Sequence, residues 1–290
     1  MSKKIKPYLM ILPSISIVVL IFIVGLFFAT IKSLGYFPEI GLDNYSLVYY
    51  KEIFTNKEFL SSFFFSLRIA FISSIVSVVF GLMLAIIYFH NKVKDKTTLL
   101  TIDFPIAMPH IIVGFFVVSL LSQTGIISRL LFALGLISDS SQFYMLVYDK
   151  GGIGIIIAYI IKGTPFILML TLAVLKKINM KYIDIAMNLG ANYKQALLHI
   201  IIPIITPTVL SGFVILFSYS FAAYELPTLL GPSIPKSLAE LSVIHYYNID
   251  FVGKIYASAV NIVITLLSLV FVFLYVKSTK FLSKVLGGYY

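Results

Sequence analysis

Long apolar blocks alternate with short polar segments along the whole chain. Each block contains no acidic residue and at most one Lys or Arg. A helix needs about 20 mainly apolar residues to cross the hydrocarbon core of a bilayer. Six blocks have at least about that length, so the pattern predicts six transmembrane helices, near residues 8–31, 61–89, 104–122, 152–175, 202–223 and 255–276.

Transmembrane β-strands are the alternative to helices. Such strands are about 10 residues long and alternate polar with apolar positions. The blocks in this chain are about twice that length and apolar on every side, which favours helices. The first block is too long for the apolar region of a signal peptide and lacks an A-x-A cleavage site, which favours a retained anchor.

The composition agrees with a protein embedded in a membrane. Hydrophobic residues make up 60% of the 290 residues, charged residues make up 12%, and the mean hydropathy is +1.01. A soluble domain carries about 25% charged residues, so a single soluble domain is excluded. Because the sequence has no internal repeat or low-complexity tract, residues 1–290 are expected to form one all-α integral membrane domain.

Lys and Arg are distributed unequally between the two sets of predicted loops. One set comprises both termini and the loops after the second and fourth blocks, and it holds 13 basic residues: Lys3, Lys4, Lys6, Lys92, Lys94, Lys96, Lys176, Lys177, Lys181, Lys194, Lys277, Lys280 and Lys284. The other set holds 7, spread over longer loops: Lys32, Lys51, Lys57, Arg129, Lys150, Lys236 and Lys254. Cytoplasmic loops carry the basic excess, so both termini are predicted to be cytoplasmic. The net charge of +10 is therefore a topology signal, and no nucleic-acid partner is expected.

Residue types for catalysis or metal binding do not cluster in this sequence. The chain has no Cys, which excludes a disulfide scaffold, a thiolate metal site and a cysteine nucleophile. The four His are scattered and no H-E-x-x-H occurs, so no metal site is expected. ATP hydrolysis would need G-x-x-x-x-G-K-S/T, and in the nearest segment, Gly231 to Ser237, Pro235 stands where the second Gly is required. The chain is therefore predicted to be a non-enzyme without a cofactor of its own.

One polar loop, residues 177–201, has a distinct pattern. Residues before Gly190 favour a helix, and Gly190 stops it because glycine tolerates a positive φ. A helical pattern resumes at residues 192–202, and Pro203 and Pro207 fit the first turn of the fifth block. The loop is thus predicted to carry a short amphipathic helix, held between two breaks and able to dock on a partner.

The same loop resembles a known motif. Asp184-x-Ala186-x-x-x-Gly190-Ala191, followed by Pro203, is similar to the EAA loop of permease subunits of binding-protein-dependent ABC importers. That motif reads E-A-A-x-x-x-G. In this chain Asp replaces its Glu and Ile replaces its first Ala, which keeps the acid and the apolar face.

Three further segments within residues 60–276 resemble motifs of this family, namely Pro105 to Gly114, Lys162 to Phe166 and Tyr224 to Gly231. The last of them resembles the branch that imports polyamines, iron, sulfate and phosphonate. The first predicted span is similar to the extra N-terminal helix of that branch.

The resemblance implies a type I ABC importer permease fold, as a multi-pass subunit of the inner or plasma membrane. The implied partners are a second permease, identical or homologous, two cytoplasmic ATPase subunits that bind ATP and Mg, and an extracytoplasmic solute-binding protein. The implied ATPase-coupling residues are Asp184, Ala186, Met187, Gly190, Ala191 and Pro203. The implied solute is small and polar: a polyamine first, then phosphonate, iron, thiamine or sulfate.

Polar residues inside the blocks are candidates for the translocation pathway, because charges in hydrocarbon are costly. Lys162 would line the pathway or contact the second permease, or else it packs with its ammonium on a carbonyl oxygen or on Asp103. The other candidates for pathway or inter-permease contacts are Ser73, Ser77, Ser218, Tyr224, Glu225 and Asn261. The structural alternative for many of them is a small-residue contact between helices.

A subunit of a secondary transporter driven by an ion gradient is the alternative function. That class predicts inverted repeats and broken helices near the middle of the membrane. The sequence pattern indicates neither feature, so the importer permease is preferred.

Overall fold

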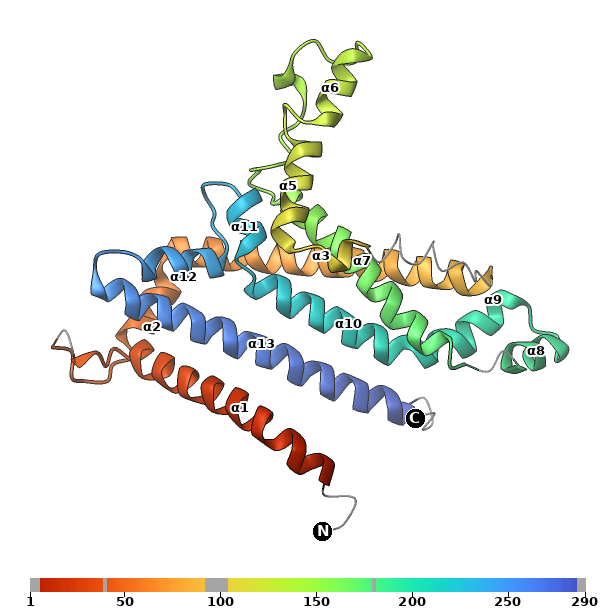
Figure 1. Ribbon diagram of the computed structural model, residues 1–290, viewed down its shortest axis with the longest axis horizontal. Coiled ribbons are helices and arrows are strands. Elements are labelled where there is room, and N and C mark those ends of the chain that lie inside the picture. Colours follow the sequence, from red (N-terminus) through yellow and green to blue (C-terminus); the bar gives the residue numbers. More distant parts are fainter. Residues whose placement is uncertain (1–5, 39–40, 92–103, 179–180, 286–290) are drawn as a thin grey trace. The chain divides into compact units, whose positions relative to one another are not determined.

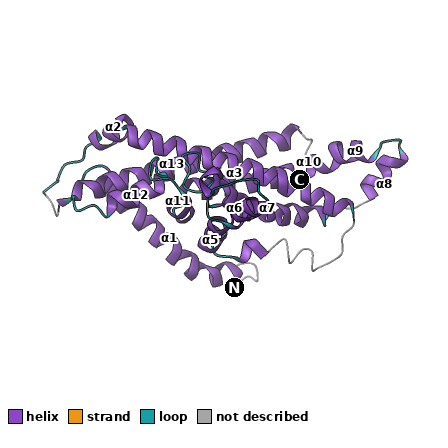
Figure 2. Ribbon diagram, turned by 90° about the horizontal axis from the view of Figure 1, so that it is seen from above, coloured by secondary structure: helices purple, strands orange, loops and turns teal. Residues whose placement is uncertain are grey.

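The computed structural model describes residues 6–38, 41–91, 104–178 and 181–285 of the chain. Within these ranges the regular elements are helices, apart from one antiparallel bridge between Phe37 and Leu42 (Figures 1 and 2). In the described part of the chain, six helical stretches are long and apolar enough to cross a membrane: Met10–Ser33, Lys57–His90, His110–Ala133, Ile153–Leu175, Tyr193–Ala222 and Phe251–Lys277. The all-α class and the predicted number of spans are thereby confirmed.

The elements have the following bounds: α1 (Lys6–Ser33), α2 (Val48–Thr55), α3 (Lys57–His90), α5 (His110–Leu121), α6 (Ile126–Ala133), η2 (Ser140–Gln142), α7 (Ile153–Leu175), α8 (Lys181–Asn188), α9 (Tyr193–Ala196), η3 (Leu197–Ile201), α10 (Ile202–Ala222), α11 (Glu225–Leu230), α12 (Leu238–Tyr246) and α13 (Phe251–Val285). η2 is a 3₁₀-helix and η3 is a π-helix. The chain divides into two compact units. The first comprises Met1–Leu60 and Leu241–Leu266, and the second comprises Ser61–Glu240 and Leu267–Tyr290.

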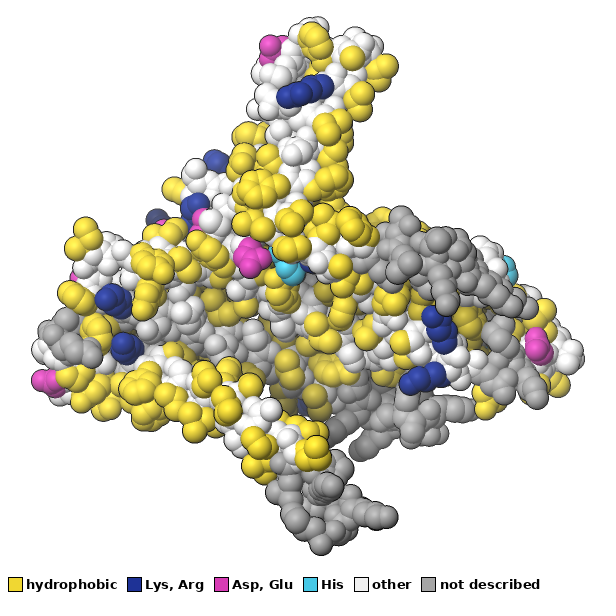
Figure 3. All heavy atoms as spheres, in the orientation of Figure 1, with side chains coloured by type: hydrophobic (Ala, Val, Ile, Leu, Met, Phe, Trp, Pro, Cys, Tyr) yellow, Lys and Arg dark blue, Asp and Glu magenta, His cyan; other side chains and the backbone are white. Residues whose placement is uncertain are grey.

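The first unit contains α1, α2 and the beginning of α13. The hydroxyl of Tyr50 donates a hydrogen bond to Ser33 Oγ at 2.7 Å, which ties α2 to the end of α1. His245 lies against Tyr256 with ring centroids 4.2 Å apart. Burial lowers the pKa of His245, and the charge of Glu58 opposes this shift. Hydrophobic side chains cover α1, and none of its most apolar window is buried (Figure 3), as suits a helix surrounded by lipid chains.

The second unit is organised around α7. This helix packs against α10 and α5, and α11 packs against both α5 and α7. Small residues bring α3 close to α7. A Cβ on Gly81 would lie 2.6 Å from Ile167 Cβ, and a Cβ on Gly163 would lie 2.8 Å from Ser77 Cβ. Close approach at small residues is the usual way in which membrane helices pack.

Among the described residues of the second unit, buried apolar side chains form two groups. The group near α5 and α11 consists of Phe65, Ile69, Val113, Val117, Val147, Ile155, Ala158, Tyr159, Leu226 and Leu230. The group near α8 and α9 consists of Ala85, Leu168, Leu172, Leu175, Ile183, Ala196, Ile201, Ile205 and Val209. Between these groups, on both α3 and α7, the inward residues become polar, and the candidate site lies there.

The third predicted span, residues 104–122, is not a single helix. Residues 104–107 are helical, the helix breaks at Met108 and Pro109, and α5 begins at His110. Proline has no N–H to donate and disfavours helical backbone in the residue before it. The predicted third span therefore contains a break at Met108 and Pro109, which the length of the apolar block does not indicate.

The two ends of α10 carry different short helices. η3 and α9 precede its first residue and α11 follows its last, so these short helices lie at opposite ends of α10 (Figure 1). α5 packs on α11, and α6 lies beyond α5, away from α10 (Figure 1). A membrane crossed by α10 would therefore have the α8–α9 segment on one side and α11 on the other.

Candidate functional site

A cavity of about 230 Å³ lies among α3, α5, α7 and α10. It is lined by residues of these helices and of the segment before α5: Ser73, Ser74, Ser77, Ile106, His110, Tyr159, Lys162, Gly163, Phe166, Ile215, Leu216, Tyr219 and Ser220. The wall is mostly apolar, and the polar side chains among these residues are hydroxyls, an imidazole and an ammonium group. An apolar cavity with a few convergent polar groups is the common form of a small-molecule site.

Lys162 reaches from the middle of α7 to the break before α5. Its ammonium donates hydrogen bonds to the carbonyl oxygen of Met108 and, at 3.4 Å, to that of Ile106. Carbonyl oxygens at the end of a helical segment lack partners within it, and the ammonium takes that place here. The pairing with a carbonyl oxygen is therefore present, and Lys162 also lines the cavity. Asp103, the other partner considered, lies outside the described residues.

Three hydroxyls of the cavity wall have no hydrogen-bond partner among the described residues. They belong to Ser74 and Ser77 on α3 and to Tyr159 on α7. Their side chains are 1%, 1% and 5% exposed, respectively. Burial of an unsatisfied polar group costs about 1–3 kcal/mol. The hydroxyl of neighbouring Ser73 does find a partner, the Ala70 carbonyl oxygen at 3.4 Å. The three unpaired oxygen atoms have almost no accessible surface, so they lie between the packed helices rather than open to the cavity.

Aromatic rings form the part of the wall beside Lys162. His110 stacks on Tyr219 with centroids 4.8 Å apart and 29° between the ring planes, and Tyr219 meets Tyr159 edge to face at 6.4 Å. Glu225 at the start of α11 is exposed and does not line the cavity, but its charge acts on both Lys162 and His110. The site thus combines a positive group in the wall with a negative group outside it.

The predicted pathway residues lie in different places. Ser73, Ser77 and Lys162 come together in the wall of the cavity. Ser218 lies on α10 outside that wall, and its buried hydroxyl has no partner among the described residues. Asn261 is exposed on the part of α13 that belongs to the first unit.

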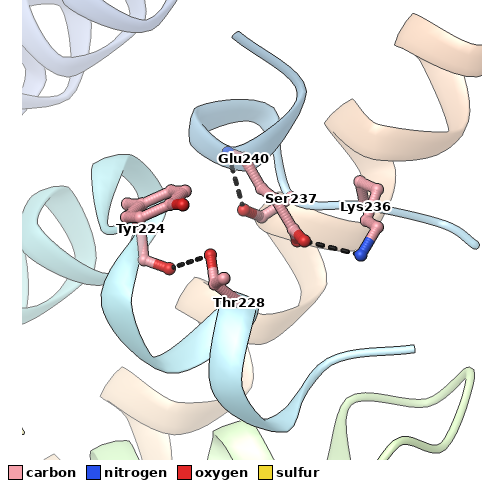
Figure 4. Close-up of polar contacts among 5 residues, drawn as sticks. All are labelled: Tyr224, Thr228, Lys236, Ser237 and Glu240. Atoms are coloured by element: carbon pink, nitrogen blue, oxygen red, sulfur yellow. Dashed lines mark hydrogen bonds and ion pairs between the residues drawn. The ribbon is translucent and has the colours of Figure 1, made fainter. Parts of the chain in front are cut away.

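Tyr224 belongs to the start of α11 rather than to the cavity. Its carbonyl oxygen accepts a hydrogen bond from Thr228 Oγ1 at 2.9 Å (Figure 4). In the following turn, the Lys236 ammonium pairs with the Glu240 carboxylate at 2.6 Å, and the Glu240 N–H donates to Ser237 Oγ at 3.2 Å (Figure 4). The lysine of the segment compared above with a phosphate-binding loop therefore has a structural partner.

Among the cavity residues that the sequence did not identify, three have polar rings, namely His110, Tyr159 and Tyr219. An ionisable residue inside an apolar block is itself a signal of function, so His110 was available as a candidate. The sequence around the two tyrosines does not indicate a site. They come from α7 and α10, and only the packing of these helices brings them together.

The segment predicted to contact an ATPase forms a well-defined turn at the end of α8. The Gly190 N–H donates to the Met187 carbonyl oxygen at 3.0 Å, and the Ala191 N–H donates to the Ala186 carbonyl oxygen at 3.0 Å. This pair of bonds is the Schellman motif, which requires a left-handed residue at the position of Gly190, where φ is +91°. A Cβ on Gly190 would meet nothing within 4 Å, so within this chain glycine is needed for its backbone conformation.

α9 begins directly after this turn. The Asn192 side chain accepts from the Gln195 N–H at 2.9 Å, and the Gln195 side chain accepts from the Asn192 N–H at 2.8 Å, which completes a capping box. η3 then continues the helix into α10, where Pro203 is the second residue. Because proline cannot donate to the carbonyl oxygen four residues earlier, a wider turn before it is favoured. Residues Tyr193–Ala222 therefore form one helical rod.

α8 has a buried side and an exposed side. Ile183 is 3% exposed and packs with Ala196 and Ile201, and Ala186 is half-buried beside them. Asp184 is exposed. The outer side also carries exposed apolar side chains, namely Tyr182, Ile185 and Met187, and exposed Leu189 directly follows the helix. An apolar surface of this kind is typical of a protein–protein contact.

Comparison with known proteins links these features to a family. Residues 77–283 match the family described as binding-protein-dependent transport system inner membrane component. The chain is 25% identical over 248 residues to the sulfate transport system permease protein CysT of Salmonella typhimurium, covering 85% of this chain and 86% of that protein. It is 29% identical over 188 residues to the ferric transport system permease protein FbpB of Actinobacillus pleuropneumoniae, covering 64% of this chain and 25% of that protein.

The fold is similar to that of solved transporters. A bacterial ABC transporter involved in the import of the acidic polysaccharide alginate aligns with a TM-score of 0.75 at 22% identity, covering 96% of this chain and 97% of the other. A bacterial alginate ABC transporter in complex with an alginate pentasaccharide-bound periplasmic protein aligns with a TM-score of 0.73 at 23% identity, covering 94% of each chain. These alignments extend over nearly all of this chain.

Proposed function

This chain belongs to the family of binding-protein-dependent transport system inner membrane components and has the type I ABC importer permease fold, and on that premise we propose how it works. The chain forms part of the translocation pathway for a small polar solute. ATP hydrolysis in separate subunits drives the transport. Its six apolar helices make it a multi-pass membrane protein, and we infer that this membrane is the inner or plasma membrane of the cell.

The exposed apolar side of α8 is the observation that carries this proposal. Leu189 is 83% exposed and Tyr182 is 58% exposed, although α8 is anchored to the core of the second unit through Ile183. A short helix that is fixed on one side and apolar on the other is suited to dock into a groove of a partner. In this proposal the partner is a cytoplasmic ATPase subunit.

The geometry after α8 suggests how a movement of the ATPase reaches the pathway. Between the closing turn of α8 at Gly190 and the cap of α9 at Asn192 stands only Ala191. A displacement of α8 therefore passes into α10 through a short and hydrogen-bonded connection. Since α10 contributes Tyr219 and Ser220 to the cavity wall, the same displacement changes the shape of the cavity.

The predicted coupling residues have distinct parts in this scheme. Asp184 provides a polar contact and Met187 an apolar contact with the ATPase, since both are exposed. Gly190 and Ala191 form the turn that sets the angle of α8. Ala186 lets α8 lie close to the core, and Pro203 marks the start of α10.

The proposed complex contains further subunits. A second permease, identical or homologous, completes the pathway, and two ATPase subunits bind ATP and Mg. An extracytoplasmic solute-binding protein delivers the solute. The similarity to an alginate transporter crystallised with a periplasmic protein supports the last of these partners.

The relatives agree that proteins of this kind take part in transport, but they differ in the solute. The sequence motifs rank a polyamine first, whereas the relatives include a sulfate system and a ferric system. These solutes carry charges of opposite sign. The groups that line the cavity therefore have to distinguish them.

Capture of the tagged full-length chain from native membranes tests the proposal. We expect the eluate to hydrolyse ATP. We expect Leu189→Glu to reduce the captured ATPase about tenfold, because a charge on an apolar contact surface must be desolvated on docking. Leu136→Glu is the matched control, since Leu136 is 68% exposed but lies after α6, and it should leave the captured ATPase unchanged. Equal capture by both variants, or solute uptake without any ATPase, would refute the proposal.

A further inference from the structure

α2 lies where the chain leaves one membrane span and approaches the next. The span Met10–Ser33 has 24 residues. It is therefore about 36 Å long, more than the hydrocarbon core of about 30 Å, so that Ser33 lies at the membrane surface. The Tyr50 hydroxyl on α2 donates to Ser33 Oγ at 2.7 Å, and only Asn56 separates α2 from α3. α2 is therefore held near the depth at which α1 ends.

The inner side of α2 is fixed against the rest of the first unit. Ile53 is fully buried, and the Tyr49 ring packs so closely on Gly35 that a Cβ there would collide with it. The Phe54 ring meets the Phe59 ring edge to face, with centroids 5.5 Å apart. These contacts set the rotation of α2 about its own axis and thus determine which side chains face outward.

One edge of α2 presents apolar side chains outward. Leu47, directly before the helix, is 68% exposed, and Phe54 in its last turn is 52% exposed. Lys51 lies between them at the spacing i, i+4, i+7, which places all three on one edge of the helix. The long stem of such a lysine can lie along an apolar edge while its ammonium reaches the headgroup region. Glu52 lies on a different side, about 160° around the helix from Phe54.

Lysines and aromatic rings gather at the same end of the first unit. The Lys32 ammonium at the end of α1 lies 4.8 Å from the centroid of the Phe37 ring. The Lys254 ammonium near the start of α13 lies 4.7 Å from the centroid of the Phe251 ring, and the two rings are 6.2 Å apart. Tyr45, in the same connection as Phe37, is exposed. Amphipathic side chains of these types are enriched at the boundary between membrane and water.

We propose that α2 is an interfacial anchor, and that its edge with Leu47 and Phe54 inserts into the lipid bilayer between the headgroups and the acyl chains. The apolar surface of α1, of whose most apolar window nothing is buried, continues toward this edge, because α1 ends at the residue that Tyr50 contacts. α2 carries one Lys and one Glu, so its attachment is apolar and does not depend on acidic lipids. Such an anchor fixes the depth of the first unit in the membrane, and the inference is independent of the proposed transport function.

Tryptophan fluorescence of the full-length chain in phosphatidylcholine nanodiscs tests the proposal, because the natural chain contains no Trp. Phe54→Trp and Leu47→Trp each introduce a single reporter on the exposed edge. Bromine atoms attached to the lipid chains quench a Trp that lies close to them. An interfacial helix enters the bilayer by only about 5–10 Å, so lipids brominated near the headgroup should quench both reporters at least about twofold more than lipids brominated near the chain ends.

Two further positions provide matched controls. Phe22 is exposed near the middle of α1, and Phe22→Trp should show the reverse preference, with stronger quenching by bromine near the chain ends. Glu52 is exposed on the other side of α2, and brominated lipids should quench Glu52→Trp at least about twofold less than Phe54→Trp. Acrylamide dissolved in the water should instead quench Glu52→Trp more strongly than Phe54→Trp.

Several results would overturn the proposal. If acrylamide quenches Phe54→Trp as strongly as Glu52→Trp, the edge faces water. If neither acrylamide nor any brominated lipid quenches Phe54→Trp, a protein surface such as a second copy of the chain covers the edge. A depth preference like that of Phe22→Trp would place the edge in the hydrocarbon core. Equal quenching of Phe54→Trp and Glu52→Trp by brominated lipids would mean that α2 has no lipid-facing edge.

Discussion

Gly190 and Lys162 each match the conformation of the backbone near them. Gly190 has a φ of +91°, and the two hydrogen bonds that close α8 depend on this conformation. Lys162 donates to carbonyl oxygens at the break that Pro109 causes before α5. Each residue thus suits its local backbone; Gly190 also lies in the proposed coupling turn, and Lys162 lies in the wall of the cavity.

Replacing Gly190 with Trp tests the turn at the residue scale. A left-handed conformation costs an L-residue about 1–2 kcal/mol, and the bulky ring would cover the exposed side of α8. We expect normal membrane insertion but at least a tenfold loss of solute uptake per ATP hydrolysed, measured in vesicles that contain the assembled complex. Gly190→Asn, which tolerates this conformation, should retain most of the coupling.

Gly135 offers a matched control for this substitution. It has a φ of +70°, and a Cβ there would also meet nothing within 4 Å, but it follows α6 instead of α8. Gly135→Trp should therefore carry the same backbone strain and keep the coupling. Unimpaired uptake by Gly190→Trp, or an equal loss in both variants, would contradict a coupling role for the turn.

At the scale of elements, α8 and the rod from α9 to α10 are joined without a flexible linker. The Schellman motif closes α8, and the capping box between Asn192 and Gln195 opens α9 immediately afterwards. The apolar contact of Ile183 with Ala196 and Ile201 holds the two parts together. In the proposed function, this construction would let the segment pass a displacement into α10, whereas a flexible loop would absorb it.

Loss of the cap should loosen this connection. Asn192→Ala removes the side chain that accepts from the Gln195 N–H, and such losses cost about 1 kcal/mol of helix stability. We expect amide hydrogen exchange at residues 193–196 to become about fivefold faster, measured by mass spectrometry. Asn192→Asp keeps the acceptor and should exchange at nearly the natural rate. Unchanged exchange in the Ala variant, or identical exchange in both, would rule out the cap as the stabilising contact.

At the scale of the whole molecule, the uneven distribution of basic residues predicts which end of the chain faces the cytoplasm. The segment from α8 to η3 lies at one end of α10 and α11 lies at the other. The basic residues favour the first of these ends as the cytoplasmic one. An ATPase can reach α8 only with this orientation, so topology is a strict requirement of the proposed function.

Cysteine labelling can determine the orientation, because the natural chain contains no Cys. Position 177 follows α7 and position 136 follows α6, and the natural side chains Lys177 and Leu136 are both exposed. The variants are Lys177→Cys and Leu136→Cys. The test uses intact cells whose outer envelope lets small reagents reach the membrane that contains the protein. A maleimide that cannot cross this membrane should label Leu136→Cys. It should label Lys177→Cys only after the membrane is opened. The reverse pattern would place α8 outside the cell and exclude its contact with an ATPase.

The sequence by itself determined the class of the protein, the number of spans and the motif of the α8 segment. These features depend on properties that a linear pattern contains: the length of apolar blocks, the lack of charge within them, and a glycine at a helix end. The turn at Gly190 is the clearest example, since its hydrogen bonds involve only residues 186–191. The break at Pro109 was also within reach of the sequence, because its cause is a single residue.

Only the tertiary structure decided which polar residues share a site. Ser77, Tyr159, Lys162 and Tyr219 come from three helices, and His110 comes from a fourth. Their meeting depends on the rotation and depth of each helix in the second unit, which close contacts such as Gly163 with Ser77 set. Hydropathy cannot encode that rotation, since these helices are apolar on nearly every side and membrane helices associate through local shape and small residues.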